Sequence, residues 1–417
     1  MVSSDSSMRP SSVADGGLTR AAVRAANALT ARWGAALGDA ASGGTGTAYS
    51  AAGVWPLLGL LYAGADEQGR SALGAAFGFE PKDLSEVADA VRSVVDLFDR
   101  GSGLSLAMGM WRRADLPIHE DWLALLPPAT RGVLSGDTRQ DQRALDAWVE
   151  RYTSGRLTRM PCQLSPKVRL LLASALTVET EWRTRFKRVA GHGVGAWADT
   201  RLALLRRDTS ATDAWLASTP GGPMTVSVLE GRDDVDVYLL LGEEGRTAAS
   251  VLGDGVAALE TLREAGVPAS TWDGDRAGDV SVPGVTISTK LSATGNPETR
   301  LECVTFSLSA EHSLLQHAAV FGLGHVSTSG NRFPGISDEP LYLDQARQNV
   351  MAEFNEQGFR AVAVTTIFMA TAAFARAQSH EAQLTTISYT RPFGFAAVHR
   401  DTGLVLVAGW VAKPDAP

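Results

Sequence analysis

An uncharged stretch near the C-terminus constrains this chain more than any other feature. From Ala361 to Ala375 the sequence has no charged residue, no Gly and no Pro, and it is rich in Val, Ile, Thr and Phe. This composition favours an extended strand, although a buried Ala-rich helix has a similar pattern. Gly358 precedes the stretch, and a Gly lets the chain pivot because positive φ costs it little. We therefore expect a hinge at Gly358 followed by an extended segment.

A hairpin is predicted at the C-terminal end. Residues Leu384 to Tyr389 are typical of a strand, and Arg391-Pro392-Phe393 leads into two alternating apolar arms. A tight turn is predicted at Arg400-Asp401-Thr402-Gly403, between the arms. The apolar residues of the arms are Phe393, Phe395 and Ala397, then Leu404, Leu406, Ala408 and Trp410. The expected order is strand, hinge, long loop and closing hairpin.

This order resembles the C-terminal part of the serpins, and the similarity covers the chain from about Leu18 to Lys413. In that family a hinge with acidic residues and a Gly precedes small residues, a reactive loop, an Arg/Lys-Pro-Phe step and a last strand. The matching segments are Asn355-Glu356-Gln357-Gly358, Ala361–Val364, the loop to Thr386, Arg391-Pro392-Phe393 and Gly409-Trp410-Val411. Two further matching segments are Phe333-Pro334-Gly335-Ile336-Ser337 and Leu341-Tyr342-Leu343. Several segments in the right order are more specific than any one of them.

The resemblance implies an α+β serpin fold with about nine helices, three β-sheets and an exposed reactive-centre loop over about residues 358–390. Helices and strands are also interspersed without a βαβ rhythm, which by itself favours α+β. No linker or repeat divides the chain, so we expect one serpin domain over residues 18–417. Residues 1–17 are rich in Ser, Gly and Asp, and we expect a disordered tail there.

Charge and cysteine content exclude several classes of partner. The net charge of -8 argues against nucleic acid and anionic membranes, because phosphate binding needs a basic surface. Cys162 and Cys303 lie far apart in no metal-ligand spacing, so free thiols are expected. The N-terminus has no apolar signal segment, which predicts a cytoplasmic protein, whereas the resemblance allows an extracellular one. We expect a monomer with no cofactor and no metal.

No motif supports an enzyme. Gly191–Gly195 lacks the strand and helix that flank a phosphate loop. A calcium-loop pattern begins at Asp273, but Gly284 stands where a bidentate Glu is needed. Three His residues between positions 312 and 325 cannot share one helix face, and the sequence has no Gly-x-Ser-x-Gly nucleophile elbow.

The resemblance implies that the reactive loop is bait for a serine protease. After attack, the freed loop inserts into the main sheet as a new strand and distorts the acylated protease. In the family the attacked bond lies about fourteen residues beyond the hinge Gly, which selects Ala372 and Ala373. A small residue there favours an elastase- or subtilisin-like protease. Phe374 and Arg376 are alternatives, and they imply chymotrypsin-like and trypsin-like targets respectively.

The hinge residues decide whether insertion works. They are Glu356, Gly358, Phe359, Arg360, Ala361 and Ala363. The positions that would face the core, from 359 to 369 in steps of two, carry no charge. Inhibitory serpins have a small residue where Phe359 stands and an acidic one where Arg360 stands, so we expect slow insertion because of overpacking. The alternative function is a non-inhibitory serpin that acts as a binding or carrier protein.

A polar gate beneath the main sheet is a second implication of the resemblance. The family's Ser, Ser and His cluster corresponds here to Gly53, Asp344 and Gln348, and Ser50 is kept. A Gln side chain still donates and accepts hydrogen bonds. We therefore expect the gate to involve Gln348 in place of the His.

Overall fold

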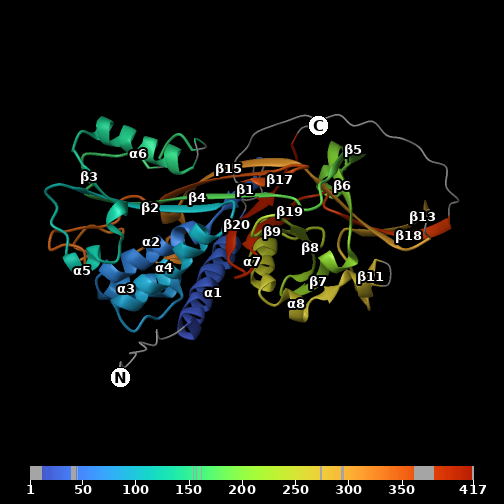
Figure 1. Cartoon of the computed structure of the whole chain (residues 1–417), viewed down its shortest axis with the longest axis horizontal. Coiled ribbons are helices and arrows are strands. Elements are labelled where there is room, and N and C mark those ends of the chain that lie inside the picture. Colours follow the sequence, from blue (N-terminus) through green and yellow to red (C-terminus); the bar gives the residue numbers. More distant parts are fainter. Residues whose placement is uncertain are drawn as a thin grey trace, which may run out of the picture.

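Alternating apolar residues form three large β-sheets with helices around them (Figure 1). The computed structural model describes residues 12–38, 44, 46–153, 155, 157–160, 162–272, 275–292, 295–360 and 380–415. In this part of the chain there are nine α-helices, sheets of seven, six and five strands, and a two-stranded ribbon. The predicted α+β architecture is therefore confirmed.

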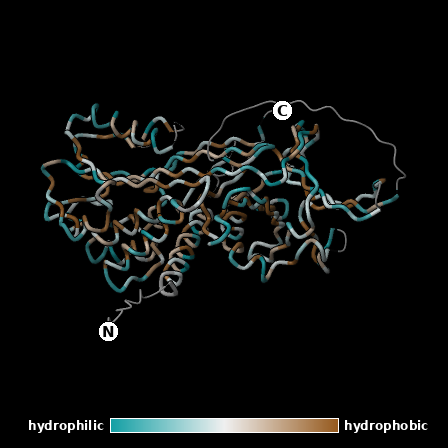
Figure 2. Tube along the Cα trace, viewed as in Figure 1, coloured by the Kyte–Doolittle hydropathy of each residue, from teal (hydrophilic) through white to brown (hydrophobic). Residues whose placement is uncertain are grey.

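Most of the helices lie on one side of the six-stranded sheet, whereas α6 lies on the other side (Figure 1). Helices on the first side alternate between hydrophilic and hydrophobic residues along their length (Figure 2), as expected for helices with one buried face. The longer helices are α1 Ser12–Ala36, α2 Ala51–Gly64, α3 Glu67–Phe77, α4 Leu84–Arg100, α6 Thr138–Tyr152 and α7 Ala248–Leu259. The short ones are α5 Glu120–Leu123, α8 Leu262–Ala265 and α9 Ala318–Phe321.

The first helix begins earlier than the sequence suggested. Residues 12–17, expected to belong to a disordered tail, lie in α1, so that part of the expectation is wrong. Extending a helix costs less than starting one, because each added residue gains a hydrogen bond for one fixed pair of dihedral angles. Residues 1–11 of the expected tail lie outside the described residues.

The six-stranded sheet contains the hinge. Its order is β15-β16-β17-β4-β2-β3. The strands are β15 Phe306–Ser313, β16 Arg347–Phe354, β17 Gly358–Arg360, β4 Leu170–Glu181, β2 Leu104–Arg113 and β3 Arg131–Leu134. The short strand β17 is antiparallel to both of its neighbours, β16 and β4. Those two neighbours therefore run parallel to each other, and β17 lies between their C-terminal ends.

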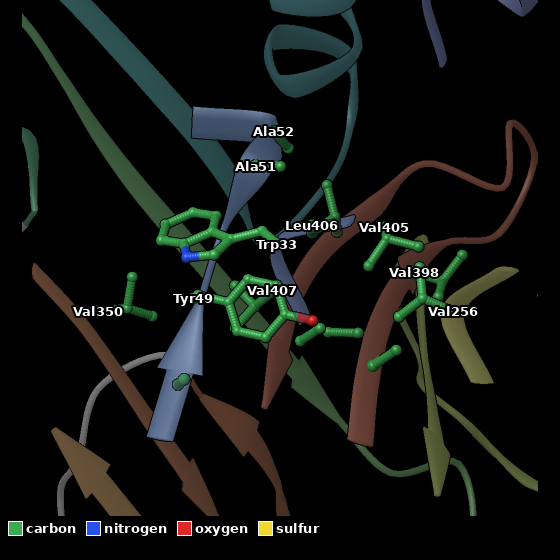
Figure 3. Close-up of a cluster of buried hydrophobic side chains, with 14 of the residues drawn as sticks. Trp33, Tyr49, Ala51, Ala52, Val256, Val350, Val398, Val405, Leu406 and Val407 are labelled. Atoms are coloured by element: carbon green, nitrogen blue, oxygen red, sulfur yellow. The ribbon is translucent and has the colours of Figure 1, made fainter. Parts of the chain in front are cut away.

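The seven-stranded sheet contains the predicted C-terminal hairpin, which is confirmed. The order is β1-β20-β19-β9-β8-β7-β10. The strands are β1 Gly46–Tyr49, β20 Val405–Val411, β19 Phe393–His399, β9 Val235–Gly242, β8 Gly222–Glu230, β7 Ala214–Thr219 and β10 Val267–Pro268. Every residue of β19 and β20 is buried, because α1, α2 and α7 cover one face and the six-stranded sheet the other. Trp33 and Tyr49 pack beside Leu406 and Val407 in this core (Figure 3).

The five-stranded sheet lies at the end of the molecule away from α6 (Figure 1). Its order is β13-β18-β14-β6-β5. The strands are β13 Val285–Ser292, β18 His380–Ser388, β14 Glu298–Val304, β6 Arg201–Thr209 and β5 Lys187–His192. The strand predicted at Leu384–Tyr389 is confirmed as far as Ser388, within β18. Residues 380–383, expected to be part of the reactive loop, are strand as well, because β13 pairs with them. The remaining strands, β11 Arg276–Ala277 and β12 Val280–Ser281, form the ribbon.

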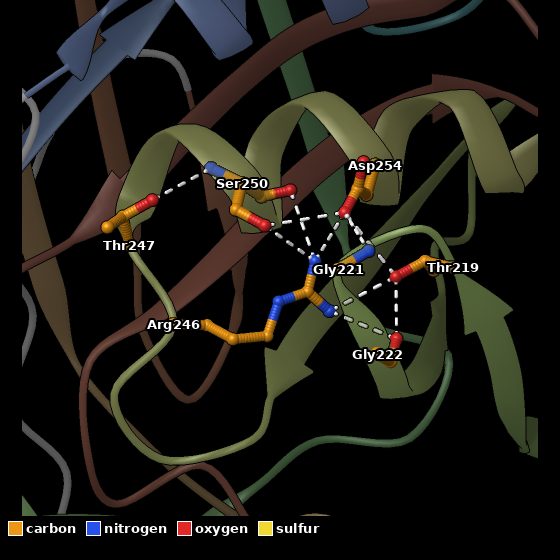
Figure 4. A network of polar contacts seen from close by, with 7 residues as sticks. All are labelled: Thr219, Gly221, Gly222, Arg246, Thr247, Ser250 and Asp254. Atoms are coloured by element: carbon orange, nitrogen blue, oxygen red, sulfur yellow. Dashed lines mark hydrogen bonds and ion pairs between the residues drawn. The ribbon is translucent and has the colours of Figure 1, made fainter.

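A buried arginine joins the start of α7 to the turn between β7 and β8 (Figure 4). Arg246 donates to Asp254 at 2.5 Å, to the Ser250 hydroxyl at 2.9 Å and to Thr219 at 3.1 Å. Its partners all belong to the scaffold, so we interpret this network as structural. None of the helices in the described part of the chain combines the length and apolar character needed to cross a bilayer.

Candidate functional site

The hinge turns the chain back into the six-stranded sheet between β16 and β4. Phe359 pairs with Phe354 of β16 and with Thr180 of β4, and Gly358 pairs with Glu181. Gly358 does not have positive φ, contrary to the expected pivot. A Gly is needed there for another reason, because a Cβ would lie 2.2 Å from the Thr180 carbonyl oxygen.

The turn before Gly358 is held by side-chain and backbone hydrogen bonds. The Asn355 side-chain oxygen accepts from the backbone N–H groups of Gln357 and Gly358, at 2.9 and 3.2 Å. The Trp182 indole donates to the Asn355 carbonyl at 2.8 Å, and its backbone N–H donates to the Gln357 carbonyl. Glu356 forms an ion pair with Arg188 at 2.8 Å. The hinge turn is thus anchored to the chain just after β4.

Phe359 lies in an aromatic cluster that we name the hinge cluster. Its members are Trp182, Phe186, Phe306, Phe354, Phe359 and Phe395. Phe359 is fully buried, with its ring 5.8 Å from that of Phe395. The expectation that Phe359 overpacks its slot and slows insertion stays a prediction, because burial by itself does not measure strain. Gly409 leaves room for the Phe395 ring of this cluster, since a Cβ there would lie 2.6 Å from that ring.

A buried carboxylate lies in β16 opposite Arg360. Glu353 is 8% exposed, and one of its oxygens accepts from the Asn355 amide at 3.3 Å. The other oxygen has no hydrogen-bond partner within the described residues. Burial raises the pKa of Glu353, and the Asn355 hydrogen bond and the Arg360 charge oppose that rise only in part.

Beyond Arg360, toward the N-terminal ends of β16 and β4, the two strands separate. We call the space between them the slot. No ladder joins the two strands directly anywhere in the described ranges. A cavity of about 260 Å³ lies there, lined by both strands and by α2. Apolar side chains such as Leu57, Leu61, Leu172 and Val350 supply much of its wall. The sheet is therefore closed at the C-terminal ends of β16 and β4 and open toward their N-terminal ends.

The predicted gate lies at this cavity. The Gln348 side chain bonds both backbone groups of Ser50, accepting from its N–H at 2.9 Å and donating to its carbonyl at 2.8 Å. The Ser50 hydroxyl donates to the Leu406 carbonyl and accepts from the Gly53 N–H, so it also caps α2. This arrangement ties β16 to α2 across the slot.

Comparison with known proteins identifies the family. The family model described as serpin (serine protease inhibitor) matches residues 25–191 and 286–414, which is more than half of the chain. This chain belongs to the serpin family. It is 27% identical over 280 residues to plasminogen activator inhibitor 1 of Sus scrofa, covering 65% of this chain and 61% of that relative. It is also 27% identical over 116 residues to serpin A3-7 of Bos taurus, covering 28% of this chain and 26% of that protein.

Solved serpin structures share the fold across nearly the whole chain. A cleaved serpin 42Da matches with a TM-score of 0.71 at 14% identity, covering 96% of this chain and 99% of that one. Thyroxine-binding globulin in complex with thyroxine matches with a TM-score of 0.69 at 15% identity, with the same coverage. At these identities the likeness concerns the fold alone.

The structure brings together some of the predicted site residues of this serpin but not all. Ser50, Gly53 and Gln348 meet at the gate, whereas Asp344 is exposed at the cavity rim. The predicted reactive-bond residues Ala372, Ala373, Phe374 and Arg376, and the hinge residues Ala361 and Ala363, lie outside the described residues.

One gate residue was missed from the sequence. The Ser174 hydroxyl of β4 donates to the Gly53 carbonyl at 2.5 Å, so it links β4 to α2 as Gln348 links β16 to α2. The available signal was a hydroxyl side chain in the middle of the apolar run from Leu170 to Val178, where Thr177 is the other one. Buried polar side chains usually have a partner, so such a residue points to a specific contact.

The remaining titratable groups have structural roles. His312 is buried and bonds the Ala48 carbonyl at 2.8 Å, and His325 bonds Asp66 at 2.8 Å. Within the described ranges, no three His, Cys, Asp or Glu side chains are grouped so that they could hold a metal ion. Cys162 and Cys303 are free thiols, as expected.

Proposed function

We propose that this serpin inhibits a serine protease as a suicide substrate. The protease serine attacks the Ala372 carbonyl carbon, the bond to Ala373 breaks, and the Ala373 amino group leaves with a proton from the protease. The ester that remains ties the protease to the chain that begins at Gly358. That chain then inserts into the slot between β16 and β4 before water hydrolyses the ester. The observation that carries this proposal is β17, already seated at the top of an unpaired slot.

The register of β17 defines how insertion would continue. Arg360 pairs with Glu179, so the same register sets Ala361 opposite Val178 and Met369 opposite Leu170, the first residue of β4. Residues at odd positions would point to the same side as the buried Phe359. Those residues are Ala361, Ala363, Thr365, Ile367 and Met369, and none is charged. An uncharged row suits the apolar wall of the cavity.

The free energy of insertion is large enough to deform a protease. About nine inserted residues would form ladders on two edges, at roughly 0.5–1.5 kcal/mol net per hydrogen bond. The total is on the order of 10 kcal/mol, which is comparable with the stability of a whole domain. Disruption of the protease active site is therefore within reach of the mechanism.

A carrier function is the second candidate, and Arg360 motivates it. Arg360 stands where inhibitory serpins have an acidic residue, and its register partner is Glu353. The cavity itself favours a strand over a carried ligand. Its volume of about 260 Å³ is below the roughly 300–1,000 Å³ that is typical of drug-sized ligand sites.

The proposed class of protease rests on the loop sequence. Ala372 and Ala373 favour an elastase- or subtilisin-like enzyme, with Phe374 and Arg376 as alternative attack sites. The predicted location, cytoplasmic with an extracellular alternative, stays a prediction.

The test is incubation with elastase-, subtilisin-, chymotrypsin- and trypsin-type proteases, followed by denaturing electrophoresis. An inhibitor leaves an SDS-resistant covalent band, whereas a carrier is only clipped. Thr365→Arg would put a charge on the inserted inner face and should convert the inhibitor into a substrate. Thr366→Arg is the matched control, because that position faces outward and should still trap. Clipping without a covalent band for every protease would refute the proposal.

A further inference from the structure

The five-stranded sheet ends in an arm made of β13 and β18. The two strands pair over eight residues, from Val285 with Ile387 to Ser292 with His380. β13 is the last strand of this sheet, so within the described residues its outer edge has no strand partner. Figure 1 shows the arm at the opposite end of the molecule from α6 and β3.

The two faces of the arm differ in burial. On one face Ala382 and Leu384 are buried, and Glu298 bonds Ser292 and Lys290. The side chains on the other face become exposed to solvent toward the tip of the arm, near Ser292 and His380. Leu291 is 69% exposed, and Ile287, four residues away on the same face with Thr289 between them, is 39% exposed.

The exposure of Leu291 is unusual for this molecule. Of the large apolar side chains that the structure describes as exposed, it has the greatest exposed fraction. Its cross-strand neighbour Glu381 is also exposed, and Thr385 lies across from Ile287. The exposed face, called the patch below, therefore carries two apolar side chains with Thr289 and Gln383 between them, and the carboxylate of Glu381 beside Leu291. Covering these apolar side chains with a partner removes apolar surface from water and so favours association.

The patch lies close to where a protease must dock. His380, at the tip of the arm, follows the candidate bonds directly in the sequence: Ala372 is eight residues before it and Arg376 is four. An extended chain spans at most about 3.5 Å per residue, so the attacked bond lies within roughly 14–28 Å of the tip. A globular protease of about 200 residues is roughly 40 Å across. A protease acting on any candidate bond is thus brought within reach of Leu291.

We propose that Leu291 and Ile287 form a secondary contact for the protease that attacks the loop. This inference rests on the proposed function and adds a specificity determinant outside the loop. The complementary protease surface is apolar and carries a basic side chain near Glu381. The contact acts on encounter and attack. It takes no part in insertion, because the patch lies in a different sheet from the slot.

The experiment measures the second-order rate constant for attack on the loop in the full-length double variant Ile287→Ser and Leu291→Ser. We expect a fall of about tenfold for the protease that cuts the wild-type loop fastest. The melting temperature should fall only slightly, because Leu291 is mostly exposed and Ile287 is partly exposed. Val133→Ser is the matched control. Val133 is 60% exposed on β3, at the other end of the molecule, and its substitution should leave the rate unchanged.

Two results would overturn the inference. One is a change of less than twofold in the double variant for every protease that cuts the loop. The other is a dimer in size-exclusion chromatography that dissociates in the double variant, which would assign the patch to a second copy of the chain. Attack is measurable whether it ends in a covalent complex or in a clipped chain. Loss of trapping alone would therefore refute the proposed inhibition and leave this contact standing.

Discussion

The two ends of the slot differ although the same two strands form both. At the C-terminal ends of β16 and β4, β17 closes the sheet between them, and Phe359 lies in the hinge cluster. Toward their N-terminal ends the strands face a cavity of about 260 Å³. There the gate side chains Ser174 of β4 and Gln348 of β16 form hydrogen bonds to the start of α2. Under the proposed mechanism, insertion would begin at the closed end, where Gly358–Arg360 already form β17.

A prepared end changes the kinetics expected for the rest of the strand. Starting a new strand is costly because several residues are ordered before their contacts form. Here the turn at Asn355 and the buried ring of Phe359 are already ordered, so this entropy cost does not arise again on insertion. Each further residue then extends an existing ladder. The four predictions that follow test this difference, from the largest effect to the smallest.

Cleavage of the loop should remove the difference between the two ends. Filling the slot adds on the order of 10 kcal/mol, which should raise the melting temperature by more than about 10 °C. Differential scanning calorimetry before and after limited proteolysis measures the shift. The cleaved Thr365→Arg variant provides the control and should melt close to the intact protein. An unchanged melting temperature in the cleaved wild type would mean that the slot does not accept the loop.

Truncating the anchor at the closed end should cost the next largest amount. Phe359→Ala removes a fully buried ring, so we expect the free energy of unfolding to fall by about 3–5 kcal/mol. Loss of the anchor should also increase the clipped fraction relative to the trapped one. Phe77→Ala removes another fully buried ring, one that does not line the cavity of the slot, and should lower stability without changing that partition. Equal partition in both variants would show that Phe359 has no special role.

Breaking the gate should have a smaller effect. Gln348→Ala leaves both backbone groups of Ser50 without their side-chain partner, so we expect a loss of about 2 kcal/mol in chemical denaturation. Gln345→Ala is the control, since Gln345 makes only a long 3.3 Å bond to the Gln163 carbonyl. Similar losses in the two variants would contradict a gate at Gln348.

The smallest effect concerns the carboxylate beneath the hinge. The pKa of Glu353 is raised by burial, so its protonated form is the one the fold favours. Its contribution to stability is full below the ordinary pKa of 4.5 and is lost as the pH rises through the raised value. Glu353→Gln should therefore leave the melting temperature unchanged at pH 4 and raise it by about 1 °C at pH 8. Equal changes in melting temperature at the two pH values would contradict this prediction.

Local pattern was enough to predict some elements and failed for others. The hairpin of β19 and β20 was predictable because its apolar alternation and its turn lie within one short segment. The start of β18 at His380 was not, since the polar residues there become strand only when β13 pairs with them. The role of Gly358 was also misjudged. Its close approach to the Thr180 carbonyl depends on a strand nearly two hundred residues earlier.

The sequence by itself determined the family, the α+β class, the uncharged inner row of the loop and the small residues at Ala372 and Ala373. These features depend on residue types and on their spacing along one segment. Only the tertiary structure decided that Phe359 is buried, that Ser174 belongs to the gate and that Leu291 is exposed to solvent. Each of these outcomes depends on which distant backbone or side chain comes within a few ångströms. Packing across segments sets those distances, and the order of residues along one segment does not reveal them.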